Sequence, residues 1–127
     1  MNARVRLVET GWDAPLGYEA DAPSAPLEAG QVRIAVEACG VCHRDLLDRE
    51  GRFPFLRLPI TPGHEAAGRV VELGPGVDGL RVGARVATMH RDACGDCVAC
   101  RRGDTTLCVG AAWVLGLLAD GGYATEL

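Results

Sequence analysis

Short stretches in which polar and apolar residues alternate recur along the chain. Charged or polar positions alternate with apolar ones from Arg4 to Glu9 and again from Gln31 to Ala38. An alternation with a period of two predicts β-strands with one buried face. Residues 66–73 and 84–89 are also predicted to be strands separated by turn residues, and a final strand is predicted to begin near Gly122.

The pattern changes between these predicted strands. After Gly40, the pair Leu46 and Leu47 is flanked by charged residues, which predicts a short helix that ends at Gly51. Residues 14–30 are rich in proline, which is unfavourable inside a helix, and they are predicted to form an extended surface connection. That connection is too short to link two domains.

The composition favours a mainly β domain. Seventeen glycines and seven prolines separate short runs of valine, leucine and alanine, as expected for brief strands and tight turns. The 127 residues fit one domain, and 48% hydrophobic residues suffice for a core. No uninterrupted apolar stretch is long enough to span a bilayer, so we expect a soluble, cytoplasmic chain with no membrane partner.

Four of the six cysteines lie close together in the sequence. Cys94, Cys97, Cys100 and Cys108 have the spacing Cys-x2-Cys-x2-Cys-x7-Cys, which suits a tetrahedral zinc site. A ferredoxin-type iron–sulfur cluster is one alternative, although its fourth cysteine follows after three residues and precedes a proline. Disulfides are another, although no apolar signal peptide precedes the domain and cytosolic thiols stay reduced.

Net charge bears on a third alternative for these cysteines, a zinc ribbon that binds nucleic acid. Such a ribbon needs a basic surface, whereas the chain has 13 basic and 17 acidic residues and a net charge of -4. We therefore expect no nucleic-acid partner.

A second group of candidate ligands combines three residue types. Cys42 lies just before the predicted helix, and His64 and Glu65 follow further along the chain. A thiolate, an imidazole and a carboxylate can hold a zinc ion and leave one position open for water or substrate. Separately, these residues have simpler explanations, because a single histidine is often structural and Cys39 with Cys42 has the spacing of a redox pair.

Gly74, Gly76 and Gly79 match the Gly-x-Gly-x-x-Gly pattern of dinucleotide-binding sites. In such a site the glycines open a helix whose N-terminus faces the pyrophosphate, whereas residues 80–83 lead directly into the next predicted strand. A turn between two strands is therefore the preferred interpretation.

Three blocks of sequence together resemble the zinc-dependent medium-chain dehydrogenase/reductase family, the alcohol dehydrogenases. They are Cys-Gly-Val-Cys-His-x-Asp at residues 39–45, Gly-His-Glu at residues 63–65 and the cysteine motif at residues 94–108. Residues 79–86 also resemble a strand entry of that family, with Ala84 in place of the usual Asp. The order and spacing of the three blocks agree with the family.

The resemblance implies a fold and an activity. It implies that residues 1–127 form an incomplete GroES-like catalytic domain, a partly open β-barrel with short helices and a zinc-binding lobe at residues 91–110. Family members continue into a Rossmann domain that binds NAD(P), and 127 residues leave no room for one. We expect this chain to be inactive alone, as a fragment or one half of a split enzyme, or to be a stand-alone zinc-stabilised binding module.

The resemblance also implies roles for individual residues. It implies a catalytic zinc held by Cys42 and His64, with Glu65 as an alternative or exchanging ligand, and a structural zinc held by the four cysteines of residues 94–108. Asp45 would hydrogen-bond the far nitrogen of His64 and support catalysis by orienting that ligand. The zinc would act as a Lewis acid on an alcohol or carbonyl substrate, and NAD(P) would carry the hydride.

Two adjacent residues complete this expectation. His43 matches a position that approaches the cofactor pyrophosphate in relatives. Arg44 stands where many alcohol dehydrogenases have Thr or Ser, whose hydroxyl begins a proton relay that an always-charged arginine cannot replace. Reductases of the same superfamily that act on activated double bonds, including acyl thioesters, are therefore an alternative. The expected protein partners are a second copy of the chain or the missing cofactor-binding half.

Overall fold

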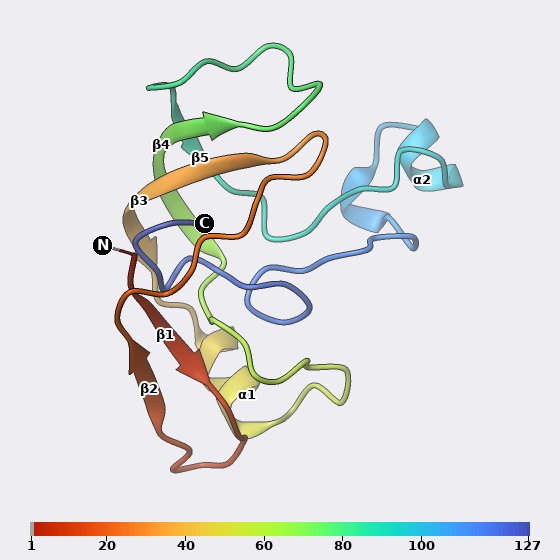
Figure 1. The fold of residues 1–127 in the computed structure, drawn as a ribbon. Helices are drawn as coiled ribbons and strands as arrows, with labels where there is room; N and C mark the ends of the chain where they lie inside the picture. Colours follow the sequence, from red (N-terminus) through yellow and green to blue (C-terminus); the bar gives the residue numbers. More distant parts are fainter. Residues whose placement is uncertain (1) are drawn as a thin grey trace.

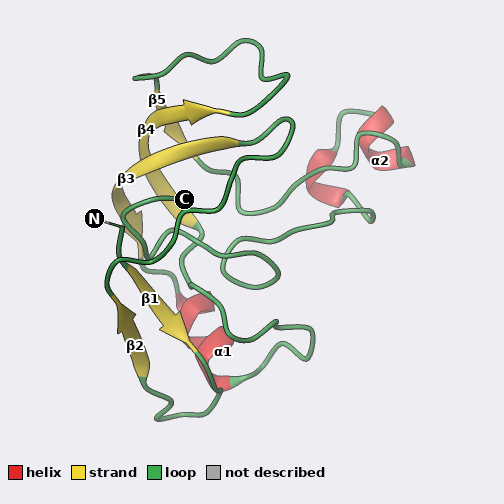
Figure 2. Cartoon of the chain, in the orientation of Figure 1, coloured by secondary structure: helices red, strands yellow, loops and turns green. Residues whose placement is uncertain are grey.

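The computed structural model describes residues 2–127 as a mainly β fold with two open sheets (Figure 1, Figure 2). Strand β1 (Arg4–Leu7) pairs antiparallel with β2 (Leu16–Glu19). Strands β3 (Val32–Gly40), β4 (Glu65–Leu73) and β5 (Arg85–Ala87) form a second antiparallel sheet in that order. The alternating segments of the sequence therefore form strands, as predicted. Strands β1 and β5 are shorter than the residue ranges predicted for them.

Three short helical segments accompany the sheets. Helix α1 (His43–Glu50) follows β3 and ends at Gly51, as predicted. Helix α2 (Val98–Arg101) and the 3-10 helix η1 (Thr105–Leu107) lie in the cysteine-rich lobe, which projects away from the sheets (Figure 1). Neither was predicted, because each is a single turn without apolar periodicity. Within residues 2–127, no helix is long and apolar enough to cross a membrane.

Strand β2 is a correction to the sequence prediction. Residues 14–30 are predicted to be an extended connection, but part of that segment pairs with β1, with Val5 opposite Tyr18 and Leu7 opposite Leu16. Leu16 and Tyr18 are both exposed. Pairing with β1 therefore stabilises this strand. Alternation of polar and apolar residues marks only strands with one buried face, so it does not predict β2.

The last residues of the chain connect the two sheets. The final strand predicted near Gly122 is not regular, and residues 123–127 instead hydrogen-bond to β1 on one side and to β3 on the other. The N–H of Val5 donates to the carbonyl of Tyr123 over 2.8 Å, and the N–H of Val36 donates to the carbonyl of Thr125 over 2.9 Å. These bonds join the sheets into the expected partly open barrel.

Strand β4 carries the buried face of the second sheet. Ala66, Gly68 and Val70 are buried and alternate with exposed residues, as the period of two predicts. Residues 74–79 form a loop between β4 and β5, which confirms a strand-to-strand turn in place of a dinucleotide fingerprint. The start of β4 brings residues 64 and 65 beside the end of β3.

Candidate metal centres

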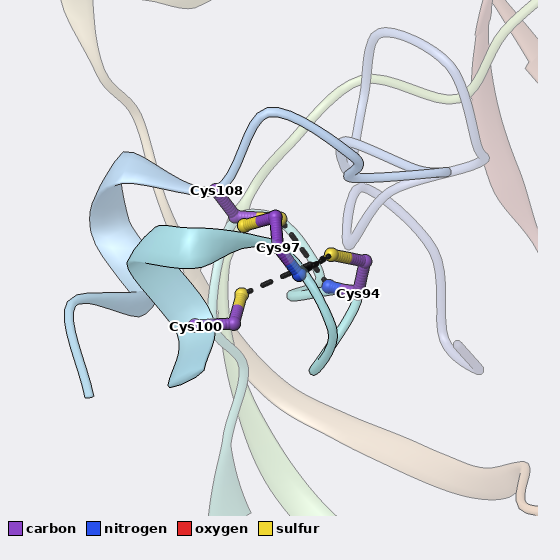
Figure 3. Close-up of side chains that lie close together, drawn as sticks. All are labelled: Cys94, Cys97, Cys100 and Cys108. Carbon is purple, nitrogen blue, oxygen red and sulfur yellow. Dashed lines mark hydrogen bonds between the residues drawn. The ribbon is translucent and has the colours of Figure 1, made fainter. Parts of the chain in front are cut away.

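The four cysteines of the projecting lobe converge on one point (Figure 3). Cys94 and Cys97 lie in the loop before α2, Cys100 lies on α2, and Cys108 follows η1. One sulfur atom from each lies within 4.8 Å of the other three, and the sulfurs of Cys94 and Cys100 are 4.0 Å apart. Zinc–sulfur bonds of about 2.3 Å in a tetrahedron place the sulfurs about 3.8 Å apart. The lobe therefore has the geometry of a site for one tetrahedral ion.

Backbone N–H groups stabilise thiolate charge in this cluster. The N–H of Cys94 donates to the sulfur of Cys108, and the N–H of Cys97 donates to the sulfur of Cys94, both over 3.3 Å. Backbone donors at Cys100 and Val109 lower the pKa of Cys97 to about 6. Burial and the adjacent Cys97 raise the pKa of Cys100 to about 12.

Backbone donors therefore favour the thiolate at Cys97, whereas burial favours the neutral thiol at Cys100. The cluster favours some thiolates, yet four negative charges within 4.8 Å repel one another. A bound cation removes that conflict and lets every thiol ionise. The four thiols therefore fit a zinc ion. All six cysteines of the described residues are free thiols, so none forms a disulfide.

The second ligand group forms where β3, α1 and β4 meet. Cys42 is the residue before α1, His64 is the residue before β4, and Glu65 is the first residue of β4. One ligand atom from each lies within 4.8 Å of the other two. Gly40 pairs with Glu65 across the sheet, and a Cβ atom at Gly40 would lie 2.2 Å from the Glu65 carboxylate, so this glycine makes room for the third ligand.

Asp45 connects two of these ligands. Its Oδ2 atom accepts a hydrogen bond from the N–H of Cys42 over 2.8 Å, and its Oδ1 atom lies 3.5 Å from Nδ1 of His64. That second distance is slightly longer than a good hydrogen bond, and neither atom has another hydrogen-bond partner in residues 2–127. A carboxylate facing one imidazole nitrogen leaves the other nitrogen free for a metal, which fits the predicted role of Asp45.

Tyr123 is a residue of this site that the sequence analysis missed. Its hydroxyl donates to Oδ2 of Asp45 over 2.9 Å. Burial and the hydrogen bond to Asp45 raise the pKa of Tyr123 well above its ordinary value, so the hydroxyl stays protonated. No sequence motif indicates this contact, because 78 residues separate the two side chains.

An open pocket of about 590 Å³ lies over the second ligand group. Its lining residues come from α1, from β4 and from the segment around β5, and they are Cys42, Arg44, His64, Glu65, Ala66, Ala67, Ala87, Thr88, Met89 and His90. Burial and the nearby arginines lower the pKa of His90, which keeps that side chain neutral. His90 was not a candidate from the sequence. The pocket gives a small molecule access to the ligand group.

Arg44 lines this pocket but is held by other contacts. Its Nε atom donates to Oδ2 of Asp48 over 3.1 Å, and its Nη2 atom donates to the carbonyl oxygen of Leu115. Asp48 is only 1% exposed, and burial raises its pKa despite the arginine. Arg44 therefore joins α1 to the segment around residue 115 and compensates a buried carboxylate.

Two other candidates lie outside the ligand group. His43 is exposed at the start of α1 and does not line the pocket. Cys39 lies at the end of β3, where burial raises the pKa of its thiol, so it is packed and weakly reactive.

A match to a known family covers most of the chain. The family described as alcohol dehydrogenase GroES-like domain matches residues 28–127. The chain belongs to this family. An NAD-dependent alcohol dehydrogenase of Sulfurisphaera tokodaii is 44% identical over 128 residues, which cover 94% of this chain and 36% of that protein.

Solved structures of the family superpose on nearly the whole chain. The crystal structure of AibC matches with a TM-score of 0.92 and 39% identity, over 99% of this chain and 35% of that one. A cobalt- and zinc-bound thermostable alcohol dehydrogenase from Pyrobaculum aerophilum matches with a TM-score of 0.85 and 31% identity, over 99% of this chain and 38% of that one. The chain thus spans about a third of the length of the relatives that it matches.

The comparisons confirm the family that the sequence resembled. Alcohol dehydrogenases of this family are zinc-dependent oxidoreductases, and the fold, the GroES-like domain and the family predicted from the sequence are confirmed. The two ligand groups lie at the positions that the resemblance indicated.

Proposed function

We propose that this chain is the zinc-binding catalytic portion of an NAD(P)-dependent alcohol dehydrogenase. In this proposal the four cysteines of the lobe hold a structural zinc, and Cys42, His64 and Glu65 hold a catalytic zinc. The observation that carries the proposal is the position of the second group. Its three ligand atoms lie within 4.8 Å of one another and line an open pocket, as a catalytic zinc site requires.

Each residue of the pocket has a separate task in this proposal. Zinc bound here would supply Lewis-acid polarisation of an alcohol or carbonyl oxygen, with a nicotinamide as hydride acceptor or donor. Cys42 would contribute a sulfur ligand, and the buried His64 would contribute a ring nitrogen, with Asp45 setting the orientation of the ring. Glu65 is exposed, which suits a ligand that exchanges with water or substrate.

Hydride transfer needs a part that these residues do not contain. Residues 2–127 include no parallel βαβ unit, so the nicotinamide must bind to a domain outside them. We infer that the chain alone binds zinc but does not transfer hydride. His43, exposed on the first turn of α1, is free to meet the cofactor pyrophosphate of such a domain.

A reductase of activated double bonds, such as those of acyl thioesters, is the second candidate. The observation that favours it is Arg44, which lines the pocket in place of a hydroxyl residue that could begin a proton relay. Comparing alcohols with unsaturated thioesters, in a protein that joins this chain to its cofactor domain, distinguishes the two activities.

Metal content tests the proposal directly. Elemental analysis of the chain, purified without added metal or chelator, should give between one and two zinc ions per molecule and no iron. The lobe should fill first, because its four ligands come from one short segment, whereas Glu65 or water must complete the second site. Cys97→Ala should therefore remove more metal than Cys42→Ala. Folded protein without zinc would overturn the proposal, and iron would favour the iron–sulfur alternative.

A further inference from the structure

We propose that Tyr123 is a positioning residue of the Cys42–His64–Glu65 site, acting through Asp45. This inference rests on the proposed function, since it concerns the metal affinity of the second ligand group. Within residues 2–127, the Tyr123 side chain hydrogen-bonds to none of the three ligands, and its hydroxyl instead donates to Asp45, the carboxylate that contacts two of them.

The carboxylate of Asp45 has two oxygens with different partners. Its Oδ2 atom accepts both the N–H of Cys42 over 2.8 Å and the hydroxyl of Tyr123 over 2.9 Å. Its Oδ1 atom accepts neither and lies 3.5 Å from Nδ1 of His64. Two donors on one oxygen fix the rotation of the carboxylate, and they leave the other oxygen directed at the imidazole.

The backbone of Tyr123 is held beside the segment that carries His64. The N–H of Tyr123 donates to the carbonyl of Pro62 over 3.0 Å, and the N–H of Gly122 donates to the carbonyl of Gly63 over 2.9 Å. The aromatic ring lies against Gly63, where a Cβ atom would come within 2.6 Å of the ring carbon Cδ1. The ring of Tyr123 therefore contacts Gly63, the residue before His64, while its hydroxyl contacts Asp45.

This arrangement gives the hydroxyl a measurable effect on metal binding. Without it, the Asp45 carboxylate keeps one donor on Oδ2 and can rotate away from His64. Partners that orient metal ligands contribute about 10–100-fold to metal affinity. Because Tyr123 acts through another residue, we expect the low end, about tenfold, which corresponds to about 1.4 kcal/mol.

The experiment measures cobalt or zinc binding by the Tyr123→Phe variant of this chain. Cobalt replaces zinc, and the difference between its visible spectrum in the unchanged chain and in Cys42→Ala isolates the second site. Tyr123→Phe should weaken metal binding at that site about tenfold in competition with a chelator and should alter its spectrum. The spectrum of the four-cysteine lobe should not change.

Two control variants separate positioning from loosening of the fold. Tyr18→Phe removes a hydroxyl from an exposed tyrosine, and Thr125→Val removes the side-chain acceptor of the Ala3 N–H in the segment that carries Tyr123. Both should leave the spectrum and affinity of the second site unchanged. If Thr125→Val weakens the site as much as Tyr123→Phe does, the hydroxyl has no specific role and the inference fails.

A double-mutant comparison tests the route through Asp45. Asp45→Asn alone should weaken the second site, and adding Tyr123→Phe should change its affinity by less than about twofold, because coupled residues are not additive. A further tenfold loss would refute action through Asp45. If the unchanged chain and Cys42→Ala give identical cobalt spectra, the proposed catalytic site itself is wrong, and the role of Tyr123 falls with it.

Discussion

Gly63 occupies a closely packed position beside His64 in the candidate catalytic site, so Gly63→Ala provides a quantitative test of the structure. Its φ angle is +93°, a backbone conformation that residues other than glycine rarely adopt. A Cβ atom there would lie 2.6 Å from Cδ1 of Tyr123, 2.9 Å from the backbone nitrogen of Tyr123 and 2.9 Å from the sulfur of Cys39. One of these neighbours is backbone, so it cannot move away without displacing the chain.

The expected cost of Gly63→Ala has two parts. The left-handed backbone conformation costs about 1–2 kcal/mol for a residue with a Cβ atom. The steric overlap adds about 1–3 kcal/mol, as for other substitutions that overpack a filled interior. The free energy of unfolding should therefore fall by about 2–5 kcal/mol, out of roughly 5–15 kcal/mol for a typical domain.

Gly83→Ala is the matched control. Gly83 has a φ angle of +87°, but no atom lies within 4 Å of the position of its Cβ, so only the backbone part of the cost applies. Urea unfolding of both variants at one fixed free zinc concentration measures the difference. For an m-value of roughly 1.5 kcal/mol per M, Gly63→Ala should lower the midpoint by about 1–3 M and Gly83→Ala by about 1 M. Equal losses in the two variants would refute the close contact with Tyr123.

Two further predictions concern ionisation and a buried ion pair. Zinc binding to the lobe should release protons near pH 7.5, because the raised pKa of Cys100 keeps that thiol protonated without metal. A pH indicator in weakly buffered solution measures the release, and Cys100→Ala should reduce it. Arg44→Thr should reduce stability by about 3–5 kcal/mol in denaturant unfolding, because it leaves Asp48 buried without its partner, and adding Asp48→Ala should recover much of the loss. Burial raises the folded-state pKa of Asp48 above its ordinary 3.8, so protonation relieves the cost at low pH, and the loss should grow as the pH rises from about 4. A loss that is independent of pH, or that Asp48→Ala does not reduce, would contradict this account of Arg44.

Local sequence patterns predicted the elements that depend mainly on residues close together in the chain. The alternation of residues 66–73 predicts β4 because every second side chain of that strand is buried. The leucine pair and Gly51 predict α1, and the spacing of the four cysteines predicts a lobe that gathers their sulfurs. Strand β2 escaped prediction because its side chains are exposed, and its pairing with β1 depends on the path of the chain between them.

The group of Cys42, His64 and Glu65 was a candidate from its residue types, and the resemblance to a family made that prediction specific. Cys42 and His64 have no local spacing that identifies a metal site, and the pairing of Gly40 with Glu65 is what brings them together. For Arg44, the sequence indicated only that a relay hydroxyl is replaced. The structure adds that its guanidinium is held against Asp48 and a backbone carbonyl.

The sequence by itself determined the residue types that can bind zinc, the strands with a buried face and the family to which the chain belongs. Tertiary structure alone decided that Tyr123 supports Asp45. Tyr123 reaches Asp45 across 78 residues, and it does so because residues 123–127 hydrogen-bond between β1 and β3. Such a contact depends on how distant segments pack against one another. Periodicity and spacing depend on residues that are close along the chain, so they cannot predict the contact between Tyr123 and Asp45.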